Sequence, residues 1–148
     1  MITTKWLTKG EDLSHAYKIR EEVFIKEQKV PEELEKDELD KTAHHVVVYE
    51  NNIPVATGRL VVTGGQYLLG RIAVLSEYRG KHLGDLVVRM LVRKAFDLGA
   101  QEVHLHAQTK VQKFYEKLGF VPYGETYMEA GIEHINMVKR EDVKGHCG

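Results

Sequence analysis

Hydrophobic and polar residues follow two different periods along this chain, and the changes of period mark out strands and helices. Short apolar runs rich in β-branched residues, separated by Asn-Asn and Gly-Gly turns, are typical of strands in a meander. Six strands are expected in this way, over 45–49, 53–62, 66–74, 103–107, 120–127 and 132–139. A short seventh strand is expected over 2–7.

Helical spacing is clearest over 85–98, where an apolar stripe runs along one face and Arg89 and Arg93 lie off it. Gly99 then ends the segment as a helix C-cap would. Further helices are expected over 12–26 and 111–118. The resulting order of elements predicts an α/β domain in which helices cover the faces of a sheet.

Two stretches lie outside this pattern. The acidic run 31–40 is interpreted as a solvated loop or a short helix, and 141–148 as a loose tail. Because no linker or repeat interrupts the pattern, we expect one domain over 1–148. A chain of this length buries roughly 70% of its unfolded surface, which suffices for one core.

Charge and cysteine content exclude several classes of protein. Lysines and arginines number 21 against 22 acidic residues, a net charge of −1, which excludes a bulk positive field for nucleic acid or an anionic membrane. No apolar run approaches the ~18 residues of a membrane span, and charged residues interrupt the start of the chain where a signal peptide would lie. The single cysteine, Cys147, cannot form an internal disulfide, so a reducing, cytoplasmic setting is expected.

The segment 69–85 carries the first chemical signal. A strand enters a loop that contains Gly80, Gly84 and the basic Arg79 and Lys81, and the loop opens into the long helix. Free backbone N–H groups at such a helix start bind phosphate groups. The Walker sequence and the dinucleotide glycine spacing are both absent, and a plain tight connection is the alternative interpretation.

The segment 106–120 carries the second signal. Phe114 and Leu118 are expected in the core, and Gly119 ends the short helix. Taken alone, Tyr115 is typical of a half-buried structural tyrosine.

Together, and in this order, the two segments resemble the Gcn5-related N-acetyltransferase (GNAT) superfamily over nearly the whole chain. Its acyl-CoA signature, Arg/Gln-x-x-Gly-x-Gly/Ala, reads Arg79-Gly80-Lys81-His82-Leu83-Gly84, and its Tyr-x-x-x-Gly-Phe element reads Tyr115-Glu-Lys-Leu-Gly119-Phe120. Similarity to the ElaA-like branch rests on Arg20-Glu-Glu-Val-Phe24, Glu27-Gln28, His106-Ala-Gln108 and Gly131-Ile-Glu-His134-Ile. His82 replaces the family's middle glycine, and histidine tolerates the positive φ that the loop requires.

The resemblance implies a mixed, mostly antiparallel sheet of six to seven strands with helices on both faces. It implies an acyl-CoA-dependent N-acetyltransferase that transfers an acetyl group from acetyl-CoA to a primary amine, the acceptor being a small molecule. The residues implied to bind the cofactor are Ile72, Ala73 and Val74 for pantetheine, Arg79, Gly80, Lys81, His82, Leu83 and Gly84 for pyrophosphate, and Tyr115.

The implied catalytic residues are Tyr115, beside the CoA thiolate, and His134, as general base. Glu27 and a water relay are the other candidates for the base. Arg20 and Arg71 match positions that face the acceptor in related enzymes, which suggests an acceptor with a carboxylate or phosphate. Glu27 is also expected among the substrate-binding residues. Surface salt bridges are the competing interpretation of the two arginines.

Two other functions stay open from the sequence. One is a CoA-binding regulatory module without turnover. The other is a metal site, since His104 and His106 alternate on one strand face and His44 or His45 could add a ligand. No cysteine or acidic residue shares the segment of His104 and His106, so we expect no metal. The expected partner is the amine acceptor, without nucleic acid or membrane, and a homodimer through the C-terminal strands is common among relatives.

Overall fold

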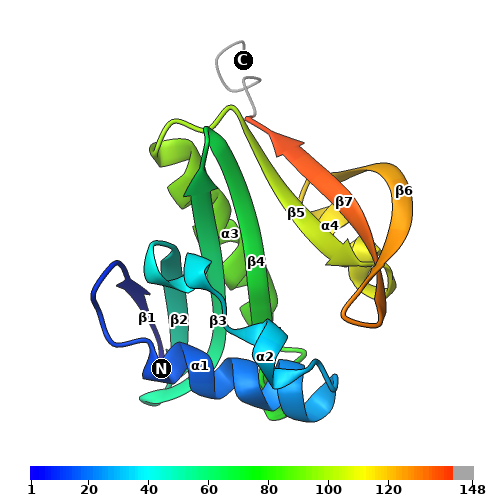
Figure 1. Cartoon of the computed structure of the whole chain (residues 1–148). Coiled ribbons are helices and arrows are strands. Elements are labelled where there is room, and N and C mark those ends of the chain that lie inside the picture. The colour runs from blue at the N-terminus through cyan, green and yellow to red at the C-terminus, as the bar shows by residue number, and fades with distance from the viewer. Residues whose placement is uncertain (142–148) are drawn as a thin grey trace.

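A single seven-stranded sheet organises the chain in the computed structural model, which describes residues 1–141 (Figure 1). The strands are β1 (Ile2–Leu7), β2 (His44–Glu50), β3 (Ile53–Thr63), β4 (Gln66–Val74), β5 (Glu102–Gln108), β6 (Val121–Glu129) and β7 (Ile132–Arg140). Their order in the sheet is β1-β2-β3-β4-β5-β7-β6. Neighbours are antiparallel except β4 and β5, which are parallel, so the predicted mixed, mostly antiparallel sheet is confirmed.

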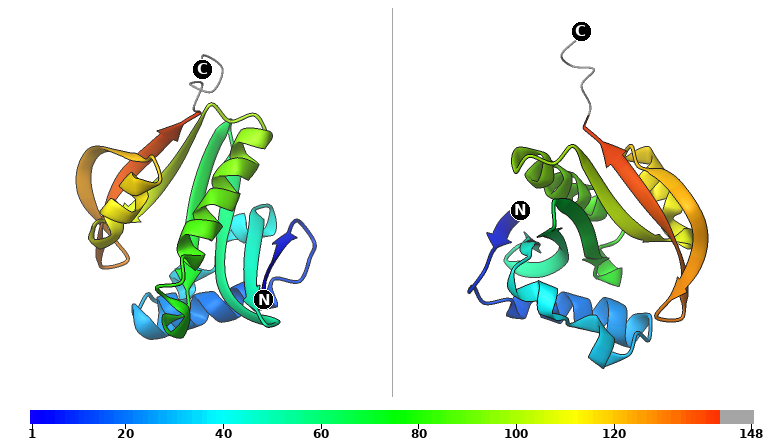
Figure 2. Two further views of the ribbon diagram at one scale, coloured as in Figure 1. Left: turned by 180° about the vertical axis from the view of Figure 1, so that it is seen from behind. Right: turned by 45° about the horizontal axis from the view of Figure 1, so that its top comes forward.

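The helices lie on both faces of this sheet, as predicted (Figures 1 and 2). They are α1 (Ser14–Arg20), the π-helical η1 (Glu21–Glu27), α2 (Glu32–Glu35), η2 (Glu38–Lys41), η3 (Ser76–Tyr78), α3 (Leu83–Asp97), η4 (Thr109–Val111) and α4 (Gln112–Lys117). None of them, within residues 1–141, is long and apolar enough to cross a membrane.

Strand alternation explains how one sheet holds two helical layers. On β2, Val46 and Val48 point to one face and pack with α3, whereas Val47 points to the other face and packs with α1. The predicted apolar stripe of α3 supplies Val87 and Leu91 to the core on the Val46 and Val48 face of the sheet. Its charged positions Arg89 and Arg93 lie outside that core.

Two predicted segments differ from the structure. The predicted helix over 12–26 is α-helical only as far as Arg20 and then widens into the π-helical η1. The acidic run 31–40 forms two short helical turns, α2 and η2, and is not fully solvated, because Glu35 and Asp40 are buried against arginines. The predicted tail lies outside the described residues from position 142 onward.

The parallel strands β4 and β5 stay together only over a short length. Their paired residues are Leu68 with His104 and Leu69 with Leu105, and beyond Leu69 the two strands diverge (Figures 1 and 2). A β-bulge accompanies the divergence, since the β3–β4 register shifts and Arg71 takes a φ of +52°. The sheet therefore opens into a wedge in the middle of the domain.

Candidate functional site

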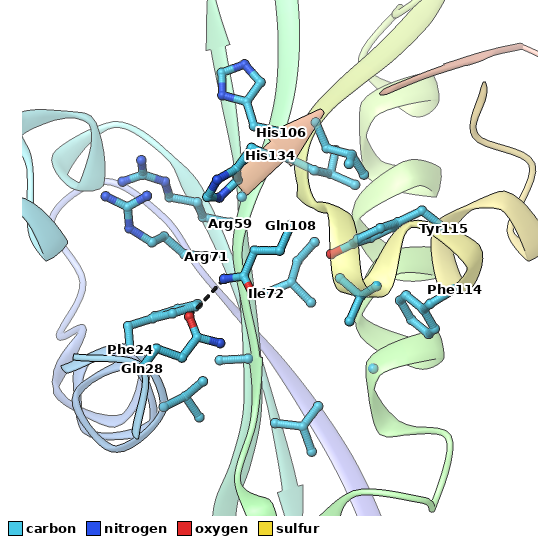
Figure 3. Close-up of a pocket in the computed structure, with 18 of the residues that line it drawn as sticks. Phe24, Gln28, Arg59, Arg71, Ile72, His106, Gln108, Phe114, Tyr115 and His134 are labelled. Carbon is cyan, nitrogen blue, oxygen red and sulfur yellow. Dashed lines mark hydrogen bonds between the residues drawn. The ribbon is translucent and has the colours of Figure 1, made fainter. Parts of the chain in front are cut away.

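The wedge between β4 and β5 contains a cavity of about 1170 Å³ (Figure 3). Its walls come from η1, the bulged half of β4, the loop before α3, helix α4 and the β6–β7 hairpin. Segments far apart in the sequence thus meet at one opening, which is the arrangement typical of ligand sites.

The β4 wall presents the edge of a strand. Ile72, Ala73 and Val74 line the cavity, and β4 pairs with β3 on its other side through Ala73 and Val74. No residue of β5 pairs with β4 beyond Leu69. Apart from the Val74 carbonyl, which accepts from Arg79, the backbone along this edge is therefore free to hydrogen-bond an extended ligand, as an added strand would.

The loop before α3 has the conformation expected for an anion site. Gly80 and His82 have φ values of +85° and +63°, so His82 adopts the left-handed conformation that its position requires. Among residues 1–141, no side chain caps the α3 N-terminus, which leaves its first N–H groups available. The cavity is lined by this loop from Arg79 to Asp85, Lys81 excepted. These donors suit a phosphate group.

Arg79 joins this loop to η1. Its Nη1 and Nη2 donate to the two carboxylate oxygens of Glu27, both at 2.7 Å, and its Nε donates to the Val74 carbonyl at 3.0 Å. The hydrogen bonds from Arg79 lower the pKa of Glu27. Glu27 lines the cavity, but as a paired carboxylate of lowered basicity.

Tyr115 lies on α4 with its ring packed edge-on against Phe114 and Phe120. Only 8% of the residue is exposed, and the hydroxyl points into the cavity (Figure 3). Burial raises the pKa of Tyr115, so the phenol keeps its proton.

His134 lies on β7, 7% exposed, and also lines the cavity. Its Nδ1 is 2.7 Å from the Ile132 carbonyl oxygen, which can only accept, so Nδ1–H donates and the neutral ring carries its lone pair on Nε2. The ring stacks on Tyr127 at a centroid distance of 6.0 Å. These contacts fix the orientation of a basic nitrogen at the cavity wall.

Gln28 and Gln108 connect the two sides of the opening. The Gln108 Nε2 donates to the Gln28 Oε1 at 2.8 Å, so η1 and β5 are bridged across the wedge (Figure 3). The sequence placed both residues among the signals of the ElaA-like branch without giving them a role.

Arg20 and Arg71, predicted together at the acceptor site, are placed differently. Arg20 is 1% exposed, donates to Glu35 and Asp40 at 2.9 and 2.8 Å, and does not line the cavity. Arg71 has 26% of its side chain exposed and lines the cavity, with its Nε donating to the Glu35 carbonyl. Burial, followed by repulsion from nearby arginines, lowers the pKa of Arg71.

Arg59 is a lining residue that sequence reasoning missed. It donates to Asp37 at 2.6 and 2.9 Å and to Asp40 at 2.7 Å. Burial alone would raise the pKa of Asp40, and Arg20 and Arg59 outweigh it and lower that pKa to about 2. A lone arginine inside the apolar run 53–62 was the available signal, because an arginine buried in a strand needs an anionic partner.

Two of the histidines considered as metal ligands, His45 and His104, have other hydrogen-bond partners. His104 contacts the Tyr123 hydroxyl at 2.9 Å and Glu102 at 2.8 Å, and His45 contacts the Asp40 carbonyl at 3.0 Å. Over residues 1–141, no group of three or more His, Cys, Asp or Glu residues is arranged to hold a metal ion. His106 instead lies at the cavity, 3.7 Å from Glu129.

Known proteins resemble this chain in sequence and in fold. Residues 9–141 match the acetyltransferase (GNAT) domain. An uncharacterized N-acetyltransferase of Bacillus subtilis, YjcF, is 42% identical over 130 residues, which cover 87% of this chain and 93% of the relative. ElaA of Escherichia coli is 31% identical over 122 residues, 79% of this chain and 80% of ElaA. The ElaA crystal structure has a TM-score of 0.86 over 95% of this chain and 100% of that one.

A GNAT family acetyltransferase of Elizabethkingia anophelis, solved with acetyl-CoA bound, has a TM-score of 0.72 at 17% identity, over 95% of this chain and 98% of that one. At this identity the likeness concerns the fold alone. The family match spans nearly all described residues, and it agrees with the signatures at Arg79–Gly84 and Tyr115–Phe120. The chain belongs to the GNAT acetyltransferase family, on its ElaA-like branch, and is an acyl-CoA-dependent acetyltransferase.

Proposed function

We propose that this enzyme transfers the acetyl group of acetyl-CoA to the primary amine of a small molecule. One observation carries the proposal: the Tyr115 hydroxyl and the His134 imidazole face the same cavity, between a free strand edge and an uncapped helix N-terminus. A proton donor, a base, an edge for an extended chain and a phosphate loop are the parts that acyl transfer from CoA requires.

In this proposal the pantetheine arm hydrogen-bonds the β4 edge at Ile72, Ala73 and Val74. The pyrophosphate binds the N–H groups of residues 80–84, beside Arg79, whereas Lys81 does not line the cavity and pairs with Glu50 at 3.2 Å. A β4 N–H group also donates to the thioester oxygen, where negative charge develops during attack. Preorganised donors of this kind are typically worth about 3 kcal/mol or more.

His134 is the proposed general base. An alkylamine is protonated near pH 7, with a reference pKa of about 10, and must lose a proton before its nitrogen can attack. The hydrogen bond from His134 Nδ1–H to Ile132 leaves Nε2 free to accept that proton. Glu27 is a weaker candidate because its carboxylate is held by Arg79, and a water relay is the third candidate.

Tyr115 is proposed to donate a hydrogen bond to the departing thiolate. Full transfer from a phenol near pKa 10 to a thiol near 8.5 costs about 2 kcal/mol, and burial raises the pKa of Tyr115 further. A charge-assisted hydrogen bond stabilises the thiolate without that cost.

At the acceptor end, Arg71 and Glu27 are the proposed substrate-binding residues that line the cavity. Arg20 acts as a positioning residue, because its guanidinium holds Glu35 and Asp40 and through them the loop that carries the cavity wall. The cytoplasmic setting and the homodimer stay predictions.

The test is thiol release from acetyl-CoA with a panel of alkylamines, amino sugars, polyamines and peptide N-termini, followed by mass analysis of the product. We expect amine-dependent release and an acetylated amine. Binding of acetyl-CoA without release for any amine would contradict the proposal and favour a CoA-binding regulatory module.

A His134→Ala variant tests the base. Its activity should fall most at neutral pH and recover in part as the pH approaches the amine's pKa of about 10, because more of the amine is then neutral. An equal loss at every pH would show that His134 is not the base.

A further inference from the structure

The five acidic residues that line the cavity differ in whether an arginine pairs with their carboxylate. Four of the five are paired with arginine in residues 1–141: Glu27 with Arg79, Glu35 with Arg20 and Arg71, Asp37 with Arg59 and Arg71, and Asp85 with Arg89. Glu129 is the fifth, and it has no lysine or arginine partner within those residues. An ammonium group that enters the cavity therefore finds one carboxylate that no arginine already neutralises.

Glu129 ends β6, where the β6–β7 hairpin turns toward the cavity. Its Oε2 is 3.8 Å from His134 Nε2, and its Oε1 is 3.7 Å from His106 Nδ1. About half of its side chain is exposed, at 51%, so the carboxylate is reached from solvent as well as from the cavity. Both distances exceed a hydrogen bond, and the site is open to a group that contacts the carboxylate and the imidazole at once.

We propose that Glu129 binds the ammonium group of the acceptor beside His134 and so selects amines that are cationic at neutral pH. The inference rests on the proposed acetyl transfer and names the class of its acceptor. A primary ammonium has three N–H donors, so it can donate to the Glu129 carboxylate and to His134 Nε2, which are 3.8 Å apart.

The proton balance follows from this geometry. One ammonium proton moves to His134 Nε2, and the electron pair left on nitrogen forms the new bond to the thioester carbon. The carbon–sulfur bond then breaks, its electron pair stays on sulfur, and the nitrogen loses a second proton as the amide forms. One proton ends on the CoA thiol and the other in solvent, so one cationic amine and acetyl-CoA give an amide, CoA and a free proton.

The surroundings of Glu129 favour this direction of transfer. Two titratable side chains contact this pair of residues: Tyr127 stacks on His134, and His106 on β5, 42% exposed, lies 3.7 Å from Glu129. The Glu129 carboxylate lies 3.8 Å from His134 Nε2, within reach of the nitrogen that takes the proton. His106, at the other carboxylate oxygen, gives this proton a route to solvent.

The experiment compares Glu129→Gln with the parent on two acceptors, an alkylamine that is cationic at neutral pH and an aromatic amine that is uncharged. We expect kcat/KM for the alkylamine to fall at least about tenfold, mostly through KM, because a hydrogen bond between charged groups is lost. For the aromatic amine the change should stay below about threefold, since no ion pair forms with it. The matched control is Glu125→Gln, which removes the same charge from β6 at an exposed position and should change neither value.

An equal loss on both acceptors would overturn the inference, as would an alkylamine KM within about threefold of the parent. Glu129→Asp checks the charge, because it should restore part of the alkylamine activity that Glu129→Gln loses. An unchanged thermal shift by acetyl-CoA in each variant confirms an intact fold and cofactor site. If the parent acetylates no amine at all, the proposed function fails first and this inference fails with it.

Discussion

Replacing Asp40 by asparagine tests the ion network that builds the acceptor wall. Asp40 is buried and accepts from Arg20 Nη1 at 2.8 Å, from Arg20 Nη2 at 3.1 Å and from Arg59 Nη1 at 2.7 Å. Asparagine keeps the shape of the side chain but removes the negative charge. Two buried guanidinium groups then lose the carboxylate that they share.

The magnitude follows from burial. Removing one partner of a buried ion pair costs about 3–5 kcal/mol, because the opposite charge stays desolvated. For a domain of this size each kcal/mol lowers Tm by about 2–4 °C, so we expect a decrease of roughly 6–20 °C. By contrast, Asp97→Asn breaks an exposed pair with Arg93 and should cost less than about 1 kcal/mol.

The pH dependence of the free energy of unfolding gives a second, independent test of the role of Asp40. The pKa of Asp40 in the folded protein is about 2, below its ordinary value, so its contribution is present above pH ~4 and is lost as the pH falls toward ~2. Urea unfolding can be followed by the fluorescence of Trp6, the single tryptophan. The free energies of parent and Asp40→Asn should converge as the pH falls through this window. A loss below about 1 kcal/mol at neutral pH, or a constant difference at every pH, would refute the reasoning.

Two further predictions concern the cofactor side. Gly84→Asp should fold, since a Cβ there meets Phe114 and Val74 at ordinary distances of 3.5 and 3.6 Å. Its negative charge, placed at the proposed pyrophosphate site, should abolish the thermal shift by acetyl-CoA. In the parent, acetyl-CoA at 100 times Kd stabilises the fold by about 2.7 kcal/mol. Gly84→Ala is the control, and a full shift in the Asp variant would remove the phosphate-loop assignment. Glu27→Gln should raise the KM for acetyl-CoA, because Arg79 loses its bidentate partner, and should keep the acid side of the pH profile. Loss of that acid side in steady-state kinetics would instead make Glu27 the base.

Much of the fold could be predicted from the sequence because its signals are local. Strand alternation around Val46–Val48, the stripe of α3 and the glycine caps all depend on neighbours in the chain. The π-helical widening after Arg20 was not predictable in this way, because the apolar period of 12–26 fits an ordinary α-helix as well. Burial of the acidic run depends on arginines from α1, β3 and β4, which no local pattern brings together.

The residues of the site also differ in whether a local sequence motif could reveal them. The loop before α3 and Tyr115 lie in contiguous motifs, so resemblance could point to them. The positive φ of His82 agrees with the glycine that the family carries at this position and with the tolerance of histidine for this conformation. The environment of Glu129 arises only where the β6–β7 hairpin meets β5, and the separation of Arg20 from the cavity depends on a three-dimensional network. The ion-pair partners of each acidic residue depend on the folded structure, so the amino-acid sequence alone does not show which carboxylates lack an arginine.

The most direct test of the proposed acetyl transfer is turnover by Tyr115→Phe. The substitution keeps the ring and its contacts with Phe114 and Phe120 and removes only the hydroxyl that faces the cavity. We expect acetyl-CoA to shift the melting temperature as in the parent while amine acetylation falls about 10- to 100-fold, because a hydrogen bond to a charged group is worth about 1.5–3 kcal/mol. Acetylation within about threefold of the parent from about pH 6 to about pH 9 would contradict the role of this cavity in releasing the CoA thiolate.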